Sequence, residues 1–512
     1  MAKYLMAVDA GTGSVRAVVF DLDGNQIGCS QQEWTHREDP RYPGSMDFDW
    51  VHNWGLASGC IRDVLHETGV APDEIAAVST TCMREGILLY DQDGNEIWAC
   101  ANVDARSTDE VGRLISTNPE LEKQLYQQSG QSYALNAIPR ILWVKDKMPE
   151  IYEKTAVVGM FNDWLIYKLT GVLAVEPSNG STTGLFDLQS RNWDPSIAQR
   201  CGLRGDIFPR VLESGTVAGV VNESGALQTG LAPGTPVVVG GGDCQLGTIG
   251  VGASDPGQAV VFGGSFWQYE FNTESGRTDP YARVRVNCHA VPGLWQYEAL
   301  AFKPGLVMRW FRDGFCQLEK QEGERTGRDP YALMDEQAAK IPTGSYGMMC
   351  CFSDVMNFIN WKHASPTFTN FELDPEKFNR YTFYRAILEN TAMLVKGHIQ
   401  LVKDAVGGEP DRLIFAGGAS KSPLWCQIKA DVMGREVVTM KNTQDAACLG
   451  AAIVAGFGYG AWDSIAETAL RFAEVDHVYH PNPEHRQTYD LLLKKWDIFI
   501  EATEGSTEEL AR

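Results

Sequence analysis

Short apolar runs alternate with polar turns at the start of the chain. Residues 4–8 are apolar and end at Asp9, and residues 15–20 are apolar again after a turn that contains Gly11 and Gly13. This alternation predicts a β-hairpin, and we expect the two glycines to adopt positive φ values in its turn.

The predicted turn has the chemistry of a phosphate-binding loop. Its backbone N–H groups and the hydroxyl groups of Thr12 and Ser14 are expected to face one space, and converging N–H groups bind phosphate. Asp9, at the end of the first strand, is placed to hold a hydrated Mg²⁺ ion beside the phosphates. The alternative interpretation is an ordinary hairpin whose glycines serve only the turn.

The same pattern returns about half a chain later. Residues 259–262 are apolar, a turn with Gly264 and Ser265 follows, and residues 266–269 continue as a second strand. Two such hairpins predict two related domains. A third glycine-rich loop, residues 416–419, precedes a predicted helix, and its glycines would let an adenosine lie against the backbone. Taken alone, this third loop is equally typical of a plain strand-to-helix connection.

The remaining periodicity predicts an α/β protein with strands and helices in alternation. Predicted helices cover residues 54–65, 383–395, 424–432 and 445–456, with another opening at 139–143, and predicted strands cover residues 75–78, 88–90, 97–100, 237–239 and 413–415. A boundary close after the strand at 237–239 divides the chain into a substrate and phosphate domain (1–244) and a nucleotide domain (245–512).

Length and charge narrow the classes of function. A chain of 512 residues is too long for one core, so more than one domain is expected. The net charge of −22 argues against nucleic-acid and anionic membrane partners. No apolar run has the length of a membrane span and no signal-peptide pattern is present, which together predict a cytoplasmic protein. The spacings of Walker and Rossmann phosphate loops are absent.

Asp243 is the candidate catalytic base. It follows three glycines, so little backbone crowding surrounds its carboxylate, and it stands between the two predicted phosphate hairpins. An aspartate after a strand is also typical of a helix N-cap. Arg84 and Glu85 follow another predicted strand and offer charged hydrogen bonds to a substrate, with a surface ion pair as the alternative.

Taken together and in this order, these elements resemble the FGGY family of carbohydrate kinases over essentially the whole chain. The matching stretches are the three glycine loops, residues 83–85, 104–106, 242–243 and 445–452. The resemblance implies two actin-like ATPase domains, of the ribonuclease H-like type, that face each other across a catalytic cleft. It also implies ATP-dependent phosphorylation of a small molecule with Mg²⁺.

The resemblance implies a role for each candidate residue. Asp243 is implied to be the base, and Asp9 to hold Mg²⁺ through water. The substrate-binding residues it implies are Arg84, Glu85, Asn102, Asp104, Gln245 and Trp267, although a tryptophan is more often a packing residue. The nucleotide-binding residues it implies are Thr12, Gly13, Ser14, Gly264, Ser265, Gly305, Gly418 and Ala419.

Four stretches are similar to family members that phosphorylate autoinducer-2, a linear dihydroxypentanedione, at its terminal hydroxyl. They are residues 82–87, 98–106, 237–247 and 308–316. Asn102 stands where many family members have an aromatic residue that packs against the sugar, which puts ordinary polyol or ketose specificity in doubt. Arg140 stands where many have lysine.

Two rival functions stay open at this stage. The first is a family kinase for xylulose, ribulose or glycerol. The second is an actin-like ATPase that transfers phosphate only to water. By analogy alone, a phosphocarrier protein of the sugar phosphotransferase system is a candidate regulatory partner.

Overall fold

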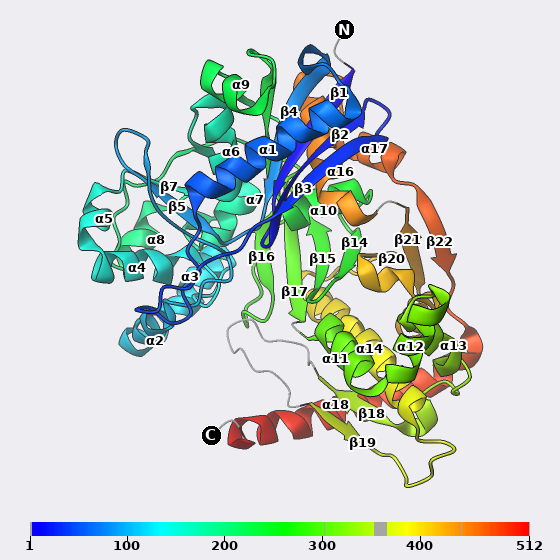
Figure 1. Cartoon of the computed structure of the whole chain (residues 1–512). Helices are drawn as coiled ribbons and strands as arrows, with labels where there is room; N and C mark the ends of the chain where they lie inside the picture. The colour runs from blue at the N-terminus through cyan, green and yellow to red at the C-terminus, as the bar shows by residue number, and fades with distance from the viewer. Residues whose placement is uncertain (1–2, 302, 353–365, 442, 511–512) are drawn as a thin grey trace. The chain divides into compact units, whose positions relative to one another are not determined.

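The computed structural model describes residues 3–301, 303–352, 366–441 and 443–510 (Figure 1). The chain forms two compact units. Unit 1 comprises Met1–Pro256, Asn272–Gln296 and Asp445–Ala473, and unit 2 comprises Gly257–Phe271, Tyr297–Gln444 and Glu474–Arg512. The chain therefore passes between the units more than once. The predicted boundary at residues 244 and 245 falls inside a helix, α10 (Asp243–Gly250).

Unit 1 is built on a six-stranded sheet with the strand order β12-β13-β4-β1-β2-β3. These strands are β1 (Tyr4–Ala10), β2 (Ser14–Asp21), β3 (Gln26–Glu33), β4 (Ile75–Cys82), β12 (Val217–Val220) and β13 (Pro236–Gly242). β1 pairs antiparallel with β2 and parallel with β4, and β4 pairs parallel with β13. The first predicted hairpin is thus confirmed, and parallel neighbours place the ends of β1, β4 and β13 at one edge of the sheet.

Helices cover both faces of this sheet. Met6 and Val8 of β1 belong to a core with Ile61 and Val64 of α1 (Trp50–Thr68), which lies across the sheet in Figure 1. The alternate residues Leu5 and Ala7 belong to a second core with α10 and α16 (Ala446–Tyr459). Because both faces are buried, β1 has the nearly continuous apolar sequence of a central strand.

α10 and α16 approach each other closely because glycines lie at their crossing. A Cβ on Gly250 would lie 1.9 Å from the carbonyl oxygen of Ala446, and a Cβ on Gly450 would lie 1.9 Å from that of Leu246. No larger residue fits at either position without moving a helix. This contact fixes α10, whose first residue is Asp243.

The other elements of unit 1 are shorter and surround the sheet. They are β5 (Ile87–Tyr90), β6 (Glu96–Cys100), α2 (Thr108–Thr117), α3 (Leu121–Ser129), α4 (Ala137–Lys147), α5 (Pro149–Lys154), β7 (Val157–Met160), α6 (Phe161–Thr170), β8 (Ala174–Val175), α7 (Pro177–Gly180), β9 (Phe186–Asp187), β10 (Asn192–Trp193), α8 (Pro195–Arg200), β11 (Arg210–Val211), α9 (Glu223–Thr229), β16 (Arg285–Cys288) and α17 (Ile465–Phe472). β6, β5 and β7 form a small sheet of their own.

Unit 2 repeats the connectivity of unit 1. Its strands follow the order β17-β15-β14-β20-β21-β22, with β14 antiparallel to β15 and parallel to β20, as β1 is to β2 and β4. The strands are β14 (Ala259–Gly263), β15 (Trp267–Thr273), β17 (Trp295–Ala301), β20 (Arg412–Ala416), β21 (Glu436–Met440) and β22 (Val475–Tyr479), with β18 (Met349–Cys351) and β19 (Thr367–Thr369) outside this sheet. The second predicted hairpin and the predicted relation between the two domains are therefore confirmed.

Most helices of unit 2 begin or end at residues that the sequence marks. They are α11 (Pro304–Phe315), α12 (Gln317–Thr326), α13 (Pro330–Ala338), α14 (Arg380–Val406), α15 (Pro423–Met433) and α18 (Pro483–Leu510). Gly434 ends α15 with φ of 66°, as expected of a glycine after a helix. Within the described residues, no helix is both long and apolar enough to cross a membrane.

Candidate active site

The turn between β1 and β2 carries the first set of candidate residues, and here one expectation is wrong. Neither Gly11 nor Gly13 has a positive φ. Crowding does not require glycine at Gly13 either, because a Cβ there would meet no atom of the described residues within 4 Å. An open position beside the backbone suits the close approach of a phosphate group.

The carbonyl oxygens of this turn are held by protein donors. Trp34 Nε1 donates to Gly11 O at 3.0 Å, and the backbone N–H of Trp34 donates to Gly13 O at 3.1 Å. His36 Nε2 lies 2.6 Å from Thr12 O and is the donor, since a carbonyl only accepts. Because the carbonyl sides of these peptide groups face Trp34 and His36, their N–H sides point the other way, as anion binding requires.

Asp9 lies at the end of β1 in a buried ionic cluster. Arg16 Nε donates to Asp9 Oδ2 at 2.9 Å, and Arg16 also pairs with Asp445 Oδ1 at 2.5 Å. Burial raises the pKa of Asp9, although Arg16 opposes this. Within the part of the chain that the structure describes, Asp9 Oδ1 has no hydrogen-bond partner. A buried carboxylate oxygen without a protein partner is suited to a Mg²⁺ ion held through water.

Arg84 and Glu85 follow β4 and are both buried. Glu85 has φ of 66°, a strained value for a residue with a side chain, and both its backbone and its side chain are held. Its carbonyl oxygen accepts from Arg140, and its Oε1 lies 2.6 Å from Arg285 NH1. Such strain is typical of functional sites, where surrounding contacts maintain it.

Arg285 was missed by the sequence analysis. It lies in β16, far from the candidate residues along the chain, and is 1% exposed. The sequence gives little signal, because Arg285 lies between Val284 and Val286 in a short stretch where polar and apolar residues alternate. Such a charge inside a strand predicts a buried partner, but the sequence does not say that the partner is Glu85.

Arg140 fixes the backbone beside Asn102. Its guanidinium donates to Asn102 O at 2.8 Å and to Asp104 O at 3.3 Å, as well as to Glu85 O. The side chain of Asn102 donates from Nδ2 to Thr12 Oγ1 at 3.0 Å. The side chain of Asn102 thus contacts a candidate phosphate-binding residue. Arg140 fixes the Asn102 backbone, and its planar guanidinium offers more donors than a lysine would.

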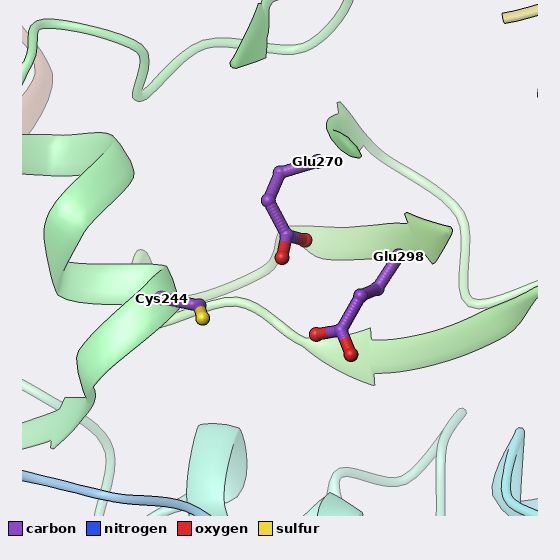
Figure 2. A group of neighbouring side chains, drawn as sticks. All are labelled: Cys244, Glu270 and Glu298. Atoms are coloured by element: carbon purple, nitrogen blue, oxygen red, sulfur yellow. The ribbon is translucent and has the colours of Figure 1, made fainter. Parts of the chain in front are cut away.

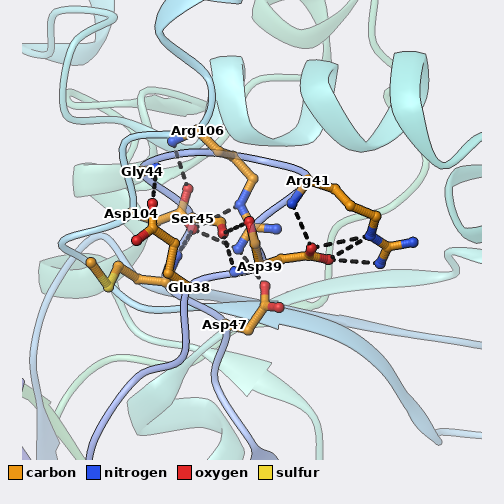
Figure 3. Close-up of polar contacts among 9 residues, drawn as sticks. Glu38, Asp39, Arg41, Gly44, Ser45, Asp47, Asp104 and Arg106 are labelled. Carbon is orange, nitrogen blue, oxygen red and sulfur yellow. Dashed lines mark hydrogen bonds and ion pairs between the residues drawn. The ribbon is translucent and has the colours of Figure 1, made fainter.

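Asp104 is enclosed by protein donors (Figure 3). Its Oδ2 accepts from Met46 N at 2.6 Å and from Arg106 Nε at 2.8 Å, and its Oδ1 accepts from Arg106 N at 3.1 Å. Its side chain is 0% exposed. Substrate contact by Asp104 stays a prediction, and the geometry favours a role in positioning the Asn102 loop.

Asp243 is the first residue of α10, and Gly242, not Asp243, is the N-cap. Arg84 Nε lies 3.5 Å from Asp243 Oδ1, and 40% of the Asp243 side chain is exposed. Burial raises the pKa of Asp243 to about 6, with smaller contributions from Asp9 and Glu85 and with Arg84 acting in the opposite direction. A carboxylate with this pKa is an effective proton acceptor near neutral pH.

Gln245 lies two residues after Asp243 in α10 and is 0% exposed. Among the described residues, neither its Oε1 nor its Nε2 has a hydrogen-bond partner. A buried amide without partners costs free energy, so such a group in a native protein calls for a ligand or water. This observation supports the predicted substrate-binding role of Gln245.

A cavity of about 650 Å³ lies within unit 2. The residues that line it include Gly264, Ser265, Gly305, Gly418 and Ala419, so the structure brings the predicted nucleotide residues of this unit together. At Gly305, a Cβ would lie 2.0 Å from the carbonyl oxygen of Gly264. This explains the glycine at Gly305, because α11 begins directly against the turn of the second hairpin.

Trp267 does not line this cavity. It is 2% exposed, and its ring packs 5.3 Å from that of Phe415 and 4.9 Å from that of Trp425. These surroundings favour the packing alternative for Trp267. Its substrate-binding role stays a prediction.

Two buried glutamates of unit 2 are not among the site residues that the sequence predicts. Figure 2 shows Glu270 of β15 and Glu298 of β17 pointing toward the same space, with Cys244 of unit 1 also drawn. Both glutamates are buried, at 0% and 1% exposed.

Models of one protein family match almost the whole chain. The N-terminal domain of the FGGY family of carbohydrate kinases matches residues 4–250, and its C-terminal domain matches residues 270–459. The chain belongs to the FGGY family of carbohydrate kinases. It is therefore a kinase with a small-molecule acceptor, as the sequence predicts.

Curated relatives make this FGGY kinase more specific. Proteins named autoinducer-2 kinase from Escherichia coli and Salmonella typhimurium are each 49% identical to it over 494 residues, covering 96% of this chain and 93% of the relative. Four sequence stretches had indicated the same group.

Solved structures confirm the predicted fold of this FGGY kinase. Xylulose kinase from Rhodospirillum rubrum aligns with a TM-score of 0.88 at 22% identity, covering 99% of this chain and 100% of that one. Plasmodium falciparum glycerol kinase with ADP aligns with a TM-score of 0.83 at 20% identity, covering 98% of each chain. At such identities the likeness concerns the fold alone.

Proposed function

We propose that this FGGY kinase transfers the γ-phosphoryl group of ATP to the terminal hydroxyl of autoinducer-2. The products are phospho-autoinducer-2 and ADP. The relatives named autoinducer-2 kinase, at 49% identity, support the choice of acceptor. The added phosphate makes the product an anion, which does not cross a membrane unaided.

The observation that carries the proposal is the relation between Asp243 and Arg84. The Asp243 carboxylate lies 3.5 Å from a guanidinium and remains 40% exposed, so an acceptor hydroxyl can reach it. With a pKa of about 6, Asp243 is mostly ionised at neutral pH and can take the proton of that hydroxyl.

The phosphate groups are assigned to the two hairpin turns. In unit 1 we assign phosphate binding to the backbone N–H and hydroxyl groups of Thr12, Gly13 and Ser14, and in unit 2 to those of Gly264 and Ser265. When bound, ATP supplies the phosphoryl group and Mg²⁺ neutralises phosphate charge, with Asp9 holding the ion through water. Gly305, Gly418 and Ala419 line the cavity assigned to the nucleoside.

The acceptor is assigned to polar groups of unit 1. Arg84, Asn102 and Gln245 offer hydrogen bonds, and Glu85 is held beside them by Arg285. A short substrate rich in oxygen atoms satisfies these groups better than a sugar that needs an apolar wall. Each buried polar group left unsatisfied by a poor substrate costs about 1–3 kcal/mol.

The rival functions differ in what accepts the phosphoryl group. A positioned base can also activate water, so Asp243 alone does not separate a kinase from an actin-like ATPase. The buried polar groups of Gln245 and Glu85 favour the kinase, because water as acceptor does not need them. We place the kinase in the cytoplasm, where ATP is supplied, and by analogy with other family members a phosphocarrier protein remains our candidate regulator.

A coupled ADP-release assay tests the proposal. Autoinducer-2, xylulose, ribulose and glycerol are compared as acceptors at equal ATP and Mg²⁺. We expect kcat/KM for autoinducer-2 to exceed that for the others by about 10²-fold or more. Comparable values for xylulose or glycerol would contradict the acceptor but leave the kinase assignment standing. ADP release independent of any acceptor would favour the ATPase.

A further inference from the structure

A buried hydroxyl group lies directly behind the residue that precedes Asp243. The backbone N–H of Gly242 donates to Ser178 Oγ at 2.9 Å. Ser178 belongs to α7, is 0% exposed, and lies 65 positions before Asp243 in the sequence. Gly242 is the last residue of β13, so this contact holds the end of the strand where α10 begins.

Glu176 fixes the direction of the Ser178 hydroxyl. Glu176 Oε1 lies 2.9 Å from Ser178 Oγ, and its two oxygens also accept from the backbone N–H groups of Ser178 and Asn179, each at 2.6 Å. Burial raises the pKa of Glu176 to about 7, while the hydrogen bonds from Ser178 and Asn179 lower it. The ionised carboxylate only accepts, so in that form of Glu176 the Ser178 hydroxyl donates to it. Its lone pairs are thereby turned toward the N–H of Gly242.

The backbone before Asp243 has little room to move. A Cβ on Gly241 would lie 2.9 Å from Ser178 Oγ, and a Cβ on Gly242 would lie 2.6 Å from Gln245 Oε1 and 3.0 Å from the Arg84 side chain. The two glycines are thus confined between Ser178 and the candidate substrate residues. A shift of Ser178 would be transmitted to this peptide and to the residue after it.

We propose that Ser178, oriented by Glu176, is a positioning residue for phosphoryl transfer. It holds the peptide that precedes Asp243 and so sets the direction in which the Asp243 carboxylate points. The inference rests on the proposed function, in which Asp243 is the base. Because a misplacement of about 1 Å can cost a reaction about 10²-fold, a single buried hydroxyl can have a large effect on turnover.

The test compares Ser178→Ala with Ser181→Ala. Ser181 lies three residues further on, is also 0% exposed, and accepts from Cys288 N at 3.0 Å instead of from Gly242. Each variant loses one buried hydroxyl with one backbone donor. We expect kcat to fall about 10- to 100-fold in Ser178→Ala. KM for ATP stays within about twofold of wild type, because Ser178 lies outside the nucleotide-binding set.

Two further measurements distinguish a positioning role of Ser178 from an effect of Ser178 on folding. The acid limb of the kcat/KM profile, which reports the base, should move in Ser178→Ala and stay in place in Ser181→Ala. Ser178→Thr, which keeps the hydroxyl, should recover most of the lost kcat. Equal kcat in the two alanine variants, or an equal loss of kcat together with an equal loss of Tm, would overturn the inference.

A second variant keeps the inference testable if Ser178→Ala does not fold. Glu176→Gln leaves the Ser178 hydroxyl in place but removes the carboxylate that orients it. We expect lower kcat with unchanged KM for ATP, and wild-type kcat with a wild-type acid limb would overturn the role of the pair. All measurements use whichever acceptor the wild type phosphorylates best. Failure of autoinducer-2 as that acceptor therefore contradicts the proposed substrate and not this inference.

Discussion

Arg84 Nε lies 3.5 Å from Asp243 Oδ1, and the two side chains differ sharply in exposure, at 4% for Arg84 and 40% for Asp243. Arg84 is therefore fixed by the protein, while the carboxylate it contacts stays open to a substrate. The buried guanidinium lowers the pKa of Asp243 against the raising effects of burial, Asp9 and Glu85. These opposing effects leave the pKa of Asp243 at about 6. The rate of phosphoryl transfer, which needs the ionised carboxylate, should therefore depend on pH near this value.

The first prediction concerns that pH dependence. A base must be ionised to act, and the pKa of Asp243 is about 6, so kcat/KM should fall as the pH drops below about 6 and level off above it. Arg84→Gln removes a group that lowers this pKa, so its acid limb should move to higher pH. Profiles of kcat/KM against pH for both proteins measure this. An acid limb at the same pH in Arg84→Gln would show that the base is not Asp243.

The second prediction concerns Asp9 and the metal. Asp9→Asn should reduce Mg²⁺-dependent turnover far more than it reduces ADP affinity without metal, because the carboxylate acts on the hydrated ion while backbone N–H groups hold phosphate. Titration calorimetry with ADP, with and without Mg²⁺, separates the two effects. Asp445→Asn is the matched control, since Asp445 is the other carboxylate on Arg16. If Asp9→Asn and Asp445→Asn lost equal amounts of Mg²⁺-dependent turnover, the loss would come from disturbing their shared partner Arg16 and not from metal binding by Asp9.

The third prediction concerns the choice of acceptor. Asn102→Phe introduces an aromatic wall where Asn102 now contacts Thr12. We expect the ratio of kcat/KM for autoinducer-2 to that for xylulose to fall at least about tenfold, since the polar contacts are lost and an apolar sugar face gains a partner. Val103→Phe is the control, because Val103 is adjacent and 50% exposed. A similar change in both variants would indicate general crowding of the loop.

The fourth prediction concerns stability. Arg106 is 2% exposed and pairs with Asp104, which is 0% exposed. Arg106→Met leaves a buried carboxylate without its charge partner and should cost about 3–5 kcal/mol of unfolding free energy. Arg41→Met breaks the pair with Asp39, in which Arg41 is 75% exposed, and should change the free energy of unfolding far less, because solvent screens an exposed ion pair. Thermal unfolding that shows equal Tm values for the two variants would contradict the structural role assigned to Asp104.

The sequence predicted the features that depend on short stretches of chain. The hairpins around Gly13 and Gly264 and the helix stop at Gly434 each follow from neighbouring residues. The sign of φ at Gly11 and Gly13 was wrong, because glycine is used both for positive φ and for open space and the sequence does not distinguish the two. At Gly13 the structure shows neither a positive φ nor a close neighbour, so glycine there leaves an open position beside the backbone.

Contacts across the fold were beyond the sequence analysis. Arg285 reaches Glu85 and Ser178 reaches Gly242 only because strands and a helix distant in sequence become neighbours. The division into units was also hidden, since residues 445–473 return to unit 1 late in the chain. Periodicity predicts the elements themselves but carries no information about such returns.

The most direct test of the account is phosphoryl transfer from γ-labelled ATP to autoinducer-2 by wild-type protein and by Asp243→Asn. The account predicts labelled phospho-autoinducer-2 from the wild type, and a rate lower by about 10²–10⁴ for the variant with ATP binding retained, since a positioned base is worth about this factor. A variant that transfers label at most of the wild-type rate, or a wild type that releases label only as inorganic phosphate, would contradict it.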